Sequence, residues 1–421
     1  MNSKEEKAYQ AAKEVYSGYG INTDKILQTL DQVSLSIHCW QADDVAGFEN
    51  VQEGLEGSGL QVTGNYPGKA GNMEEFRMDL DKAFSLIPGN HRLSLHASYG
   101  DFSAGFPGRD KIGPKHFQSW IEWAKTRNIK IDFNSTFFAH PNVKDGYTLA
   151  SKDKTIRQYW IEHGKRCREI SAFLGKEQGS RCIHNIWIPD GSKDITPSRY
   201  EHRSLLKDSL DRMLAKKYPA DQMIDSVESK LFGIGSEAFV VGSHEFYFGY
   251  AVQNNMMLTL DIGHFHPTES VADKVSSAFL FINELLFHVT RGIRWDSDHI
   301  VAFNDQLTEL MQEIVWTGKL DKVSLGLDFF DATVNRIGAY AIGARNAQKA
   351  LLLALLMPTK EMVKYENQGR YFERLALFEE FKTKPFGALW DYYCLSKNVP
   401  VGESYISEIQ KYEEEVLSKR N

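Results

Sequence analysis

The sequence predicts a (β/α)8 TIM barrel followed by a C-terminal helical extension. Eight short runs of β-branched and apolar residues are each followed by a longer stretch with helical spacing. The runs are almost continuously hydrophobic, which is typical of parallel strands covered on both faces. From the second run onward they begin about 30 to 55 residues apart, the length that a strand, a loop and a returning helix occupy.

The eight predicted strands are spread over most of the chain. They are VSLSIHCW (33–40), LSLHASY (93–99), IKIDFNSTFF (129–138), CIHNIWIP (182–189), MIDSVESK (223–230), MMLTLDIGH (256–264), LLFHVTRG (285–292) and VSLGLDFF (323–330). The long gap after the first strand contains the Gly-rich stretch 54–73. We interpret this stretch as a loop and insertion near the mouth of the barrel.

Helical patterns lie at both ends of the predicted barrel. They cover residues 1–16, 332–357, 371–383 and 402–421. We therefore divide the chain into a catalytic barrel with its N-terminal helix, residues 1–335, and a C-terminal helical extension, residues 336–421. Because an extension of this kind often packs on a neighbouring subunit, we expect residues 336–421 to make oligomer contacts.

Composition and charge exclude several classes of protein. The 421 residues include 49 Lys and Arg and 56 Asp and Glu, a net charge of −7 without a basic cluster, so we expect no nucleic-acid or anionic-membrane partner. The longest apolar run, residues 350–358, is far shorter than the ~20 residues that span a bilayer. The four cysteines lie far apart with no CxxC pair, which indicates reduced thiols and a cytoplasmic protein.

Ionisable residues gather at the trailing ends of the last four predicted strands. They are Glu228, Lys230, Asp261, His264, His288, the RWDSDH stretch at 294–299, and Asp328. Because the C-terminal ends of barrel strands face the active site, we expect these side chains to converge. Burying so many charges together without a cation would be costly, so a divalent metal is the simplest explanation. Oxygen ligands with a few imidazoles suit Mn²⁺, Mg²⁺ or Co²⁺, and the number of ligands allows two ions.

Each of these residues also has a structural alternative. A lone His or Asp near a strand end is more often a hydrogen-bonded structural residue than a metal ligand. Asp296, Ser297 and Asp298 would serve as N-caps of a helix predicted over residues 299–315, and for this stretch taken alone we favour the capping role. A Trp at a strand end, such as Trp40 or Trp187, ordinarily packs in the core.

Several uncommon strings occur in one order across nearly the whole chain. They are SIHCWQADDV (36–45), TGNYPGKA (63–70), LHASYGD (95–101), NIWIPDGSKD (185–194), SVESKLFG (226–233), LDIGHFHPTE (260–269), RWDSDH (294–299) and LGLDFFDA (325–332). In these strings the chain resembles the L-rhamnose isomerase family. The resemblance implies a metal-dependent aldose–ketose isomerase on a (β/α)8 barrel, which converts L-rhamnose to L-rhamnulose and is commonly a homotetramer.

Carried over residue by residue, the resemblance implies two metal sites. The residues that match the catalytic metal site are His264, Asp296 and Asp298, and those that match a second, structural site are Glu228, Asp261, His288 and Asp328. Glu228 is also a candidate bridge between the two metals. One or two divalent ions per subunit are expected, with Mn²⁺ as the usual ion and Mg²⁺, Co²⁺ or Zn²⁺ as substitutes.

The resemblance also implies residues that bind and convert the sugar. Lys230, His96 and Trp187 match residues that line the sugar pocket, and Trp40 ends the first strand near them. Lys230 would steady O1 as charge develops there, and Asp328 would help to move a proton between the sugar oxygens. Hydrogen would pass from C2 to C1 as a hydride. His96, at the end of the second predicted strand, is a further catalytic candidate, which would assist opening of the sugar ring or bind a sugar hydroxyl. Without the resemblance, Lys230 serves equally as a salt-bridge partner and His96 as a core histidine.

Two other functions remain open at this point. One is an isomerase of another aldose such as xylose, because that chemistry uses a similar array of Glu, Asp, His and Lys at strand ends. The other is a sugar-binding barrel without catalysis. The complete set of matched ligands, together with Lys230, argues against the second of these.

Overall fold

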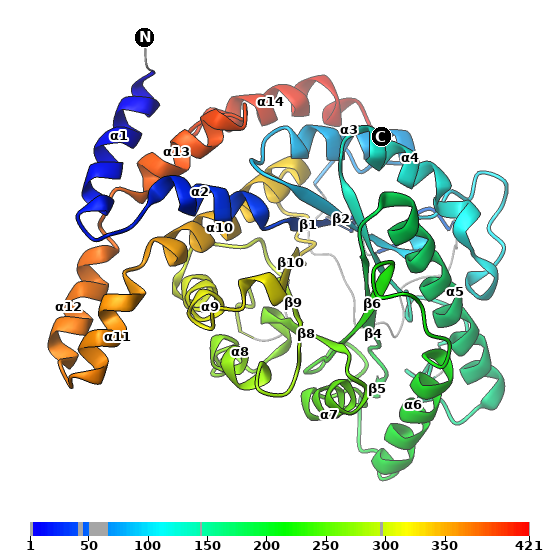
Figure 1. Ribbon diagram of the computed structural model, residues 1–421. Helices are drawn as coiled ribbons and strands as arrows, with labels where there is room; N and C mark the ends of the chain where they lie inside the picture. Colours follow the sequence, from blue (N-terminus) through cyan, green and yellow to red (C-terminus); the bar gives the residue numbers. More distant parts are fainter. Residues whose placement is uncertain (1–2, 41–44, 50–65, 144, 295–297, 421) are drawn as a thin grey trace.

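The computed structural model describes residues 3–40, 45–49, 66–143, 145–294 and 298–420. Its centre is a closed barrel of eight parallel strands, as predicted (Figure 1). The strands are β1 (Leu35–His38), β2 (His91–His96), β3 (Lys130–Asn134), β4 (Cys182–Trp187), β6 (Met223–Glu228), β8 (Met257–Asp261), β9 (Leu285–Val289) and β10 (Val323–Leu327). β10 pairs with β1, and this pairing closes the barrel. The predicted loop at 54–73 lies largely outside the described residues.

One helix follows each barrel strand and lies on the outside of the barrel (Figure 1). These helices are α3 (Met73–Phe84), α4 (Gln118–Thr126), α5 (Lys154–Gln178), α6 (Arg199–Met213), α7 (His244–Asn254), α8 (Ala272–Ala278), α9 (Asp305–Trp316) and α10 (Arg336–Leu356). A short antiparallel ribbon of β5 (Gly191–Ser192) and β7 (Phe239–Val240) was not predicted. Its two-residue strands are too short to show an alternating pattern.

The helix predicted over residues 299–315 begins later, and this changes the interpretation of the aspartates before it. α9 begins at Asp305, and its N-cap is Asn304, whose side-chain oxygen accepts a hydrogen bond from the Leu307 amide at 3.0 Å. The proposal that Asp298 caps this helix was therefore wrong. The reason is that His299 pairs with Arg291 through backbone hydrogen bonds and so belongs to a folded-back loop.

Further helices flank the barrel at both ends of the chain. They are α1 (Lys4–Ser17), α2 (Thr23–Gln32), α11 (Thr359–Asn367), α12 (Tyr371–Phe381), α13 (Phe386–Ser396) and α14 (Tyr405–Glu415). α10 packs against α2, α3 and α9, in the place of the barrel's eighth outer helix, and α1 packs against α13. The division of the chain at residue 335 stays a prediction. Among the described residues, no helix combines the length and the hydropathy needed to cross a membrane.

Close packing of the outer helices depends on glycine at one position in α5. A Cβ atom at Gly175 would lie 1.7 Å from the backbone oxygen of Gln222, which directly precedes β6. The Gln222 oxygen could not move aside as the end of a flexible side chain would, because it belongs to the backbone. Gly175 therefore lets α5 lie directly against the barrel beside β4 and β6.

We expect Gly175→Ala to lower the free energy of unfolding by about 1–3 kcal/mol, because the added methyl group overpacks the interface between helix and strand. Urea denaturation at a fixed protein concentration measures the change. Gly249→Ala in α7 is the matched control, because no atom lies within 4 Å of its added Cβ. It should stabilise the protein by about 0.5–1 kcal/mol. Equal stability of the two variants would contradict this explanation.

Candidate metal centre

A narrow cavity of about 30 Å³ lies at the C-terminal ends of the barrel strands. The predicted site residues that line it are Trp40, His96, Trp187, Glu228, Lys230, His264, His288, Asp298 and Asp328. Asp261 lies beside these residues and is 1% exposed. Asp296 falls outside the described residues. The parallel strands thus bring together side chains that are as much as 288 positions apart in the sequence, as the Trp40–Asp328 contact shows.

The first candidate ligand group joins four neighbouring strands. Glu228, Asp261, His288 and Asp328 each offer one ligand atom, and these atoms lie within 4.8 Å of one another. His288 Nδ1 is at the centre, 3.2 Å from Glu228 Oε1 and 3.1 Å from Asp328 Oδ2. It also lies 3.6 Å from Asp261 Oδ2, because Asp261 and His288 are register partners in β8 and β9. Three carboxylates and an imidazole in this arrangement could hold a divalent cation.

The second candidate group shares Asp261 with the first and adds His264 and Asp298. A 3-10 turn after β8 places His264 three residues beyond Asp261, and the Gly263 amide donates a hydrogen bond to Asp261 Oδ1 at 2.6 Å. A Cβ at Gly263 would lie 2.9 Å from Asp298 Oδ1. Because Gly263 has no Cβ, the carboxylates of Asp261 and Asp298 have room to approach each other.

Asp298 reaches the cavity because the loop after β9 folds back on itself. Arg291 and His299 exchange backbone hydrogen bonds of 3.1 and 3.3 Å. The Thr290 hydroxyl also donates to the His299 carbonyl at 3.3 Å. Asp298 directly precedes this pairing and so is carried back to the mouth of the barrel, where its side chain lines the cavity.

Glu228 contacts both groups. Its Oε1 atom lies 3.2 Å from Nδ1 of His264 and 3.2 Å from Nδ1 of His288. Its other oxygen, Oε2, accepts a hydrogen bond from Asn185 Nδ2 at 2.5 Å. Asn185 in turn accepts a hydrogen bond from the Thr259 hydroxyl at 2.8 Å. Glu228 is therefore held in one orientation between the two groups.

The electrostatics of the cluster indicate a need for positive charge. Burial raises the pKa of Asp261 to about 6, and nearby carboxylates act in the same direction. Burial disfavours a charged imidazole, but the carboxylates of Glu228, Asp261 and Asp328 raise the pKa of His288 well above its usual value. The surroundings of His288 therefore favour positive charge at this place. A divalent cation would supply that charge, so the residues fit a metal.

Aromatic and cationic side chains form the rest of the cavity wall. Trp40 Nε1 donates to Asp328 Oδ1 at 2.8 Å, and the Trp40 ring meets His96 edge-on at 4.9 Å. Trp187 stacks on His264 with ring centroids 6.1 Å apart, and Lys230 Nζ lies 5.0 Å from the Trp187 ring centroid. These contacts bring the predicted sugar-binding residues against the candidate metal ligands.

Sequence reasoning missed five residues that line this cavity: Val45, Asn134, Phe138, Asn185 and Phe330. Asn185 lies on β4 two positions before Trp187, so both side chains point to the same face of the strand, and that alternation could have identified it. Phe138 follows β3 by four residues, and its ring meets Trp187 at 5.2 Å. No signal in the sequence distinguishes Phe138 from a core phenylalanine.

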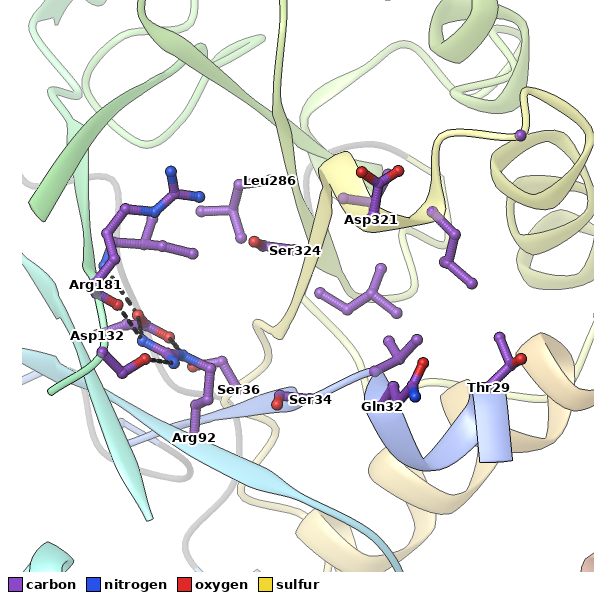
Figure 2. Close-up of a pocket in the computed structure, with 17 residues that line it drawn as sticks. Thr29, Gln32, Ser34, Ser36, Arg92, Asp132, Arg181, Leu286, Asp321 and Ser324 are labelled. Atoms are coloured by element: carbon purple, nitrogen blue, oxygen red, sulfur yellow. Dashed lines mark hydrogen bonds and ion pairs between the residues drawn. The ribbon is translucent and has the colours of Figure 1, made fainter. Parts of the chain in front are cut away.

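A wider cavity of about 590 Å³ lies at the opposite, N-terminal end of the strands (Figure 2). The charged groups there are already paired. Arg92 Nη2 lies 2.6 Å from Asp132 Oδ1, and Arg181 forms an ion pair with Glu284. The Ser36 hydroxyl and the Ile183 amide also donate hydrogen bonds to the Asp132 carboxylate. Within the described residues, both candidate metal groups lie at the other end of the barrel, so that end is the candidate functional site.

Comparison with known proteins identifies close relatives over the whole chain. A family profile described as L-rhamnose isomerase matches residues 3–420. A Bacteroides thetaiotaomicron protein named L-rhamnose isomerase is 56% identical over 415 residues, which cover 99% of this chain and 98% of that protein. The Rhodopirellula baltica protein of the same name is 53% identical over 416 residues, which cover 99% and 97%. A Salmonella agona protein with this name is 48% identical over 421 residues and the full length of both chains.

We expect Asn185→Ala to weaken Mn²⁺ binding about 10- to 100-fold, because Glu228 would lose the hydrogen bond that orients it. Isothermal titration of the metal-free protein measures this affinity. Asn134→Ala is the matched control, because Asn134 lines the same cavity but donates to Ser94 and Leu95 of β2. An equal loss of affinity in both variants would show that Asn185 has no special role.

Proposed function

The chain belongs to the L-rhamnose isomerase family of aldose–ketose isomerases, and on this basis we propose that it converts L-rhamnose to L-rhamnulose with the help of divalent metal ions. The observation that carries the metal dependence is the pair of buried ligand groups that share Asp261. Both groups border the cavity at the C-terminal ends of the strands, where barrel enzymes bind their substrates.

We propose that each subunit holds one or two ions and that Mn²⁺ is the usual one. The residues assigned to the catalytic ion are His264, Asp296 and Asp298, and those assigned to the second ion are Glu228, Asp261, His288 and Asp328. Two 3.2 Å contacts of Glu228 Oε1, to His264 and His288, support Glu228 as the link between the two sites. When bound, the metal supplies Lewis-acid polarisation of the sugar carbonyl and orients neighbouring sugar oxygens.

The reaction moves hydrogen from C2 to C1 and a proton between the two oxygens. Among the described residues, each carboxylate that lines the cavity belongs to a ligand group, which leaves none as a base against C2. Burial lowers the pKa of His96 to about 3, so His96 is a poor base near neutral pH. These features favour transfer of the hydrogen as a hydride over an enediol route.

The remaining side chains bind the sugar and stabilise developing charge. Lys230, 5% exposed, carries its ammonium group to the cavity and would stabilise the negative charge that develops on O1. Asp328 would assist the proton transfer between the oxygens. His96 would hydrogen-bond a sugar hydroxyl, while Trp40 and Trp187 would pack against the apolar side of the sugar.

We also propose that the chain forms a homotetramer and that α11 and α12 contribute to its interfaces. These two helices pack on each other and project away from the barrel (Figure 1). Phe372 is 79% exposed and Leu375 is 60% exposed, and both lie on one face of α12. An apolar face of this kind on a helix is typical of a subunit interface. A cytoplasmic location stays a prediction, and it agrees with four buried cysteines that form no disulfide.

We expect removal of divalent metal to abolish the conversion of L-rhamnose, because the carboxylates and imidazoles of the cavity would then hold only protons. The protein is treated with a chelator, freed from it, and assayed for L-rhamnulose with and without added Mn²⁺. Activity should return with Mn²⁺. Full activity after complete metal removal would refute the metal-dependent mechanism. Faster turnover of D-xylose than of L-rhamnose would refute L-rhamnose as the substrate.

Two aspartate variants provide the matched comparison for this experiment. Asp298→Asn should lower kcat by about 100-fold or more, since Asp298 belongs to a ligand group. Asp305→Asn should leave kcat within about twofold of the native value, because Asp305 is an exposed residue of the first turn of α9. Circular dichroism confirms that both variants are folded.

We expect Leu375→Glu to raise the dissociation constant of the assembly by about 100-fold or more, because an unpaired charge in an apolar interface costs about 3–5 kcal/mol. Sedimentation velocity at several protein concentrations measures the change. Val252→Glu on α7 is the control, since Val252 is an exposed apolar residue away from α11 and α12. If the Leu375→Glu variant assembles like the native protein, α12 is not part of the interface.

A further inference from the structure

A buried arginine links three of the loops that form the wall opposite the candidate metal ligands. Arg109 lies in the connection between β2 and α4 and is 2% exposed. Its Nη2 atom donates to Glu49 Oε2 at 2.8 Å, and its Nε atom donates to Glu49 Oε1 at 3.0 Å. Glu49 follows β1, so this bidentate ion pair joins the segments after the first two strands.

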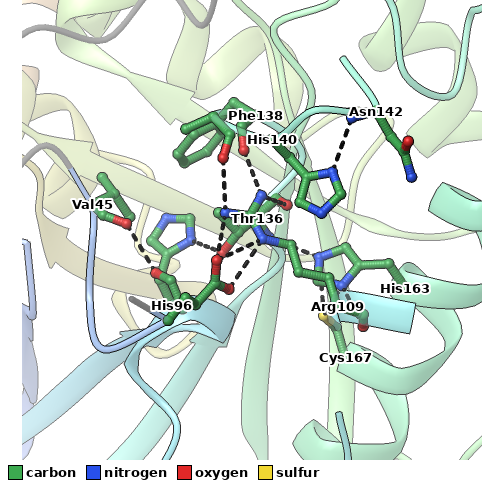
Figure 3. A network of polar contacts seen from close by, with 12 residues as sticks. Val45, His96, Arg109, Thr136, Phe138, His140, Asn142, His163 and Cys167 are labelled. Carbon is green, nitrogen blue, oxygen red and sulfur yellow. Dashed lines mark hydrogen bonds and ion pairs between the residues drawn. The ribbon is translucent and has the colours of Figure 1, made fainter. Parts of the chain in front are cut away.

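The same guanidinium also holds the segment that follows β3. Nη1 donates to the carbonyl oxygen of Thr136 at 3.0 Å and to that of Phe138, and Nη2 donates to that of Ala139 at 3.2 Å. Ala139 has a φ of 49°, a left-handed conformation that is strained for alanine and needs support from its surroundings. Arg109 supplies that support. Figure 3 shows the guanidinium at the centre of this network.

Two residues of the segment held by Arg109 contact His96. The Thr136 hydroxyl lies 3.0 Å from His96 Nδ1, and the Phe138 ring lies 5.6 Å from the His96 ring. His96 and Phe138 line the cavity. Because the Thr136 hydroxyl holds Nδ1, its position sets the orientation of the imidazole and therefore the direction in which Nε2 points.

A second buried residue reinforces the link between Arg109 and Thr136. His163 on α5 accepts a hydrogen bond from the Thr136 amide at Nε2, with a distance of 3.1 Å. Its Nδ1 therefore carries the proton and donates to the Arg109 carbonyl oxygen at 3.1 Å. His163 thus ties the backbone of Arg109 to that of Thr136 (Figure 3).

We propose that Arg109 is a positioning residue of this isomerase, which acts through Thr136 and Phe138 to orient His96 and the aromatic wall that faces the sugar. This inference rests on the proposed binding of the sugar in the cavity. The ligand groups come from β6 to β10, on the other side of the barrel. Arg109 therefore influences sugar binding without influencing metal binding.

Arg109→Lys keeps the positive charge beside Glu49 but cannot reproduce the fork of hydrogen bonds to the three carbonyl oxygens. We expect the KM for L-rhamnose to rise about tenfold, with a smaller change in kcat, because the sugar-facing wall loosens. Mn²⁺ affinity should stay within about twofold of the native value, since metal binding is held by separate strands. Steady-state kinetics and calorimetry measure these quantities.

Thr136→Val tests the last link alone, because it removes the hydroxyl beside His96 and leaves the bonds from Arg109 to the backbone in place. Like Arg109→Lys, Thr136→Val should raise the KM for L-rhamnose. In the double variant, the increase in KM should be smaller than the product of the two single increases, because both changes act through Thr136. Independent, multiplicative effects would overturn the proposal.

Arg168→Lys is the matched control for the loss of a buried arginine. Arg168 is 3% exposed and binds one carboxylate, that of Asp225, and two carbonyl oxygens, those of Met213 and Lys216. Its replacement should reduce the melting temperature without a change in KM. If both lysine variants raise KM equally, Arg109 has only a general role in stability.

A crystal structure of the Arg109→Lys variant separates this proposal from the proposed function. The His96 ring and residues 136–139 should move, while Glu228 and His288 keep their positions. An unmoved His96 would overturn the positioning role even if KM changes. A native protein that makes no L-rhamnulose would instead refute the proposed function, and the movement of His96 would still decide the role of Arg109.

Discussion

Carboxylates from β6, β8 and the end of β10 surround a single imidazole in the protein interior, and this crowding constrains the whole site. Glu228, Asp261 and Asp328 meet His288 within 4.8 Å. Like charges at such distances repel strongly where little water can screen them, so they need positive charge between them. The raised pKa of His288, which these carboxylates cause, indicates that need, and a divalent cation would meet it for both ligand groups, since they share Asp261.

The barrel makes this crowding possible because its parallel strands end at the same level. Register pairs Asp261 with His288 across β8 and β9, so the two side chains come together without a special loop. Interior hydrogen bonds then orient the ligands, as Asn185 does for Glu228. The fold therefore supplies both the convergence of charge and the hydrogen bonds that keep each carboxylate in place.

The two sides of the barrel have different tasks. The candidate metal ligands lie on or directly after β6, β8, β9 and β10, whereas His96 and the aromatic residues Trp40, Phe138 and Trp187 lie on or after β1 to β4. The segment that contains Phe138 is held by Arg109, which satisfies its five donors with one carboxylate and three carbonyl oxygens. Apart from Lys230, which follows Glu228 after β6, the sugar-facing residues lie on other strands than the metal ligands, so this part of the pocket would be free to change while the metal ligands stay fixed.

By itself, the sequence determined the barrel and most of the residues at its mouth. Buried parallel strands require continuous hydrophobic runs, and charged residues directly after such runs must lie at the mouth, so local patterns were sufficient. The start of α9 follows a local signal that the sequence interpretation overlooked, the N-cap Asn304. The pairing of Arg291 with His299, which no local pattern encodes, keeps His299 in the preceding loop. The roles of Asn185 and Arg109 likewise depend on partners 43 and 60 positions away, Glu228 and Glu49. Only the tertiary structure brings such partners together, because hydrogen bonds between distant segments leave no periodic signal in the sequence.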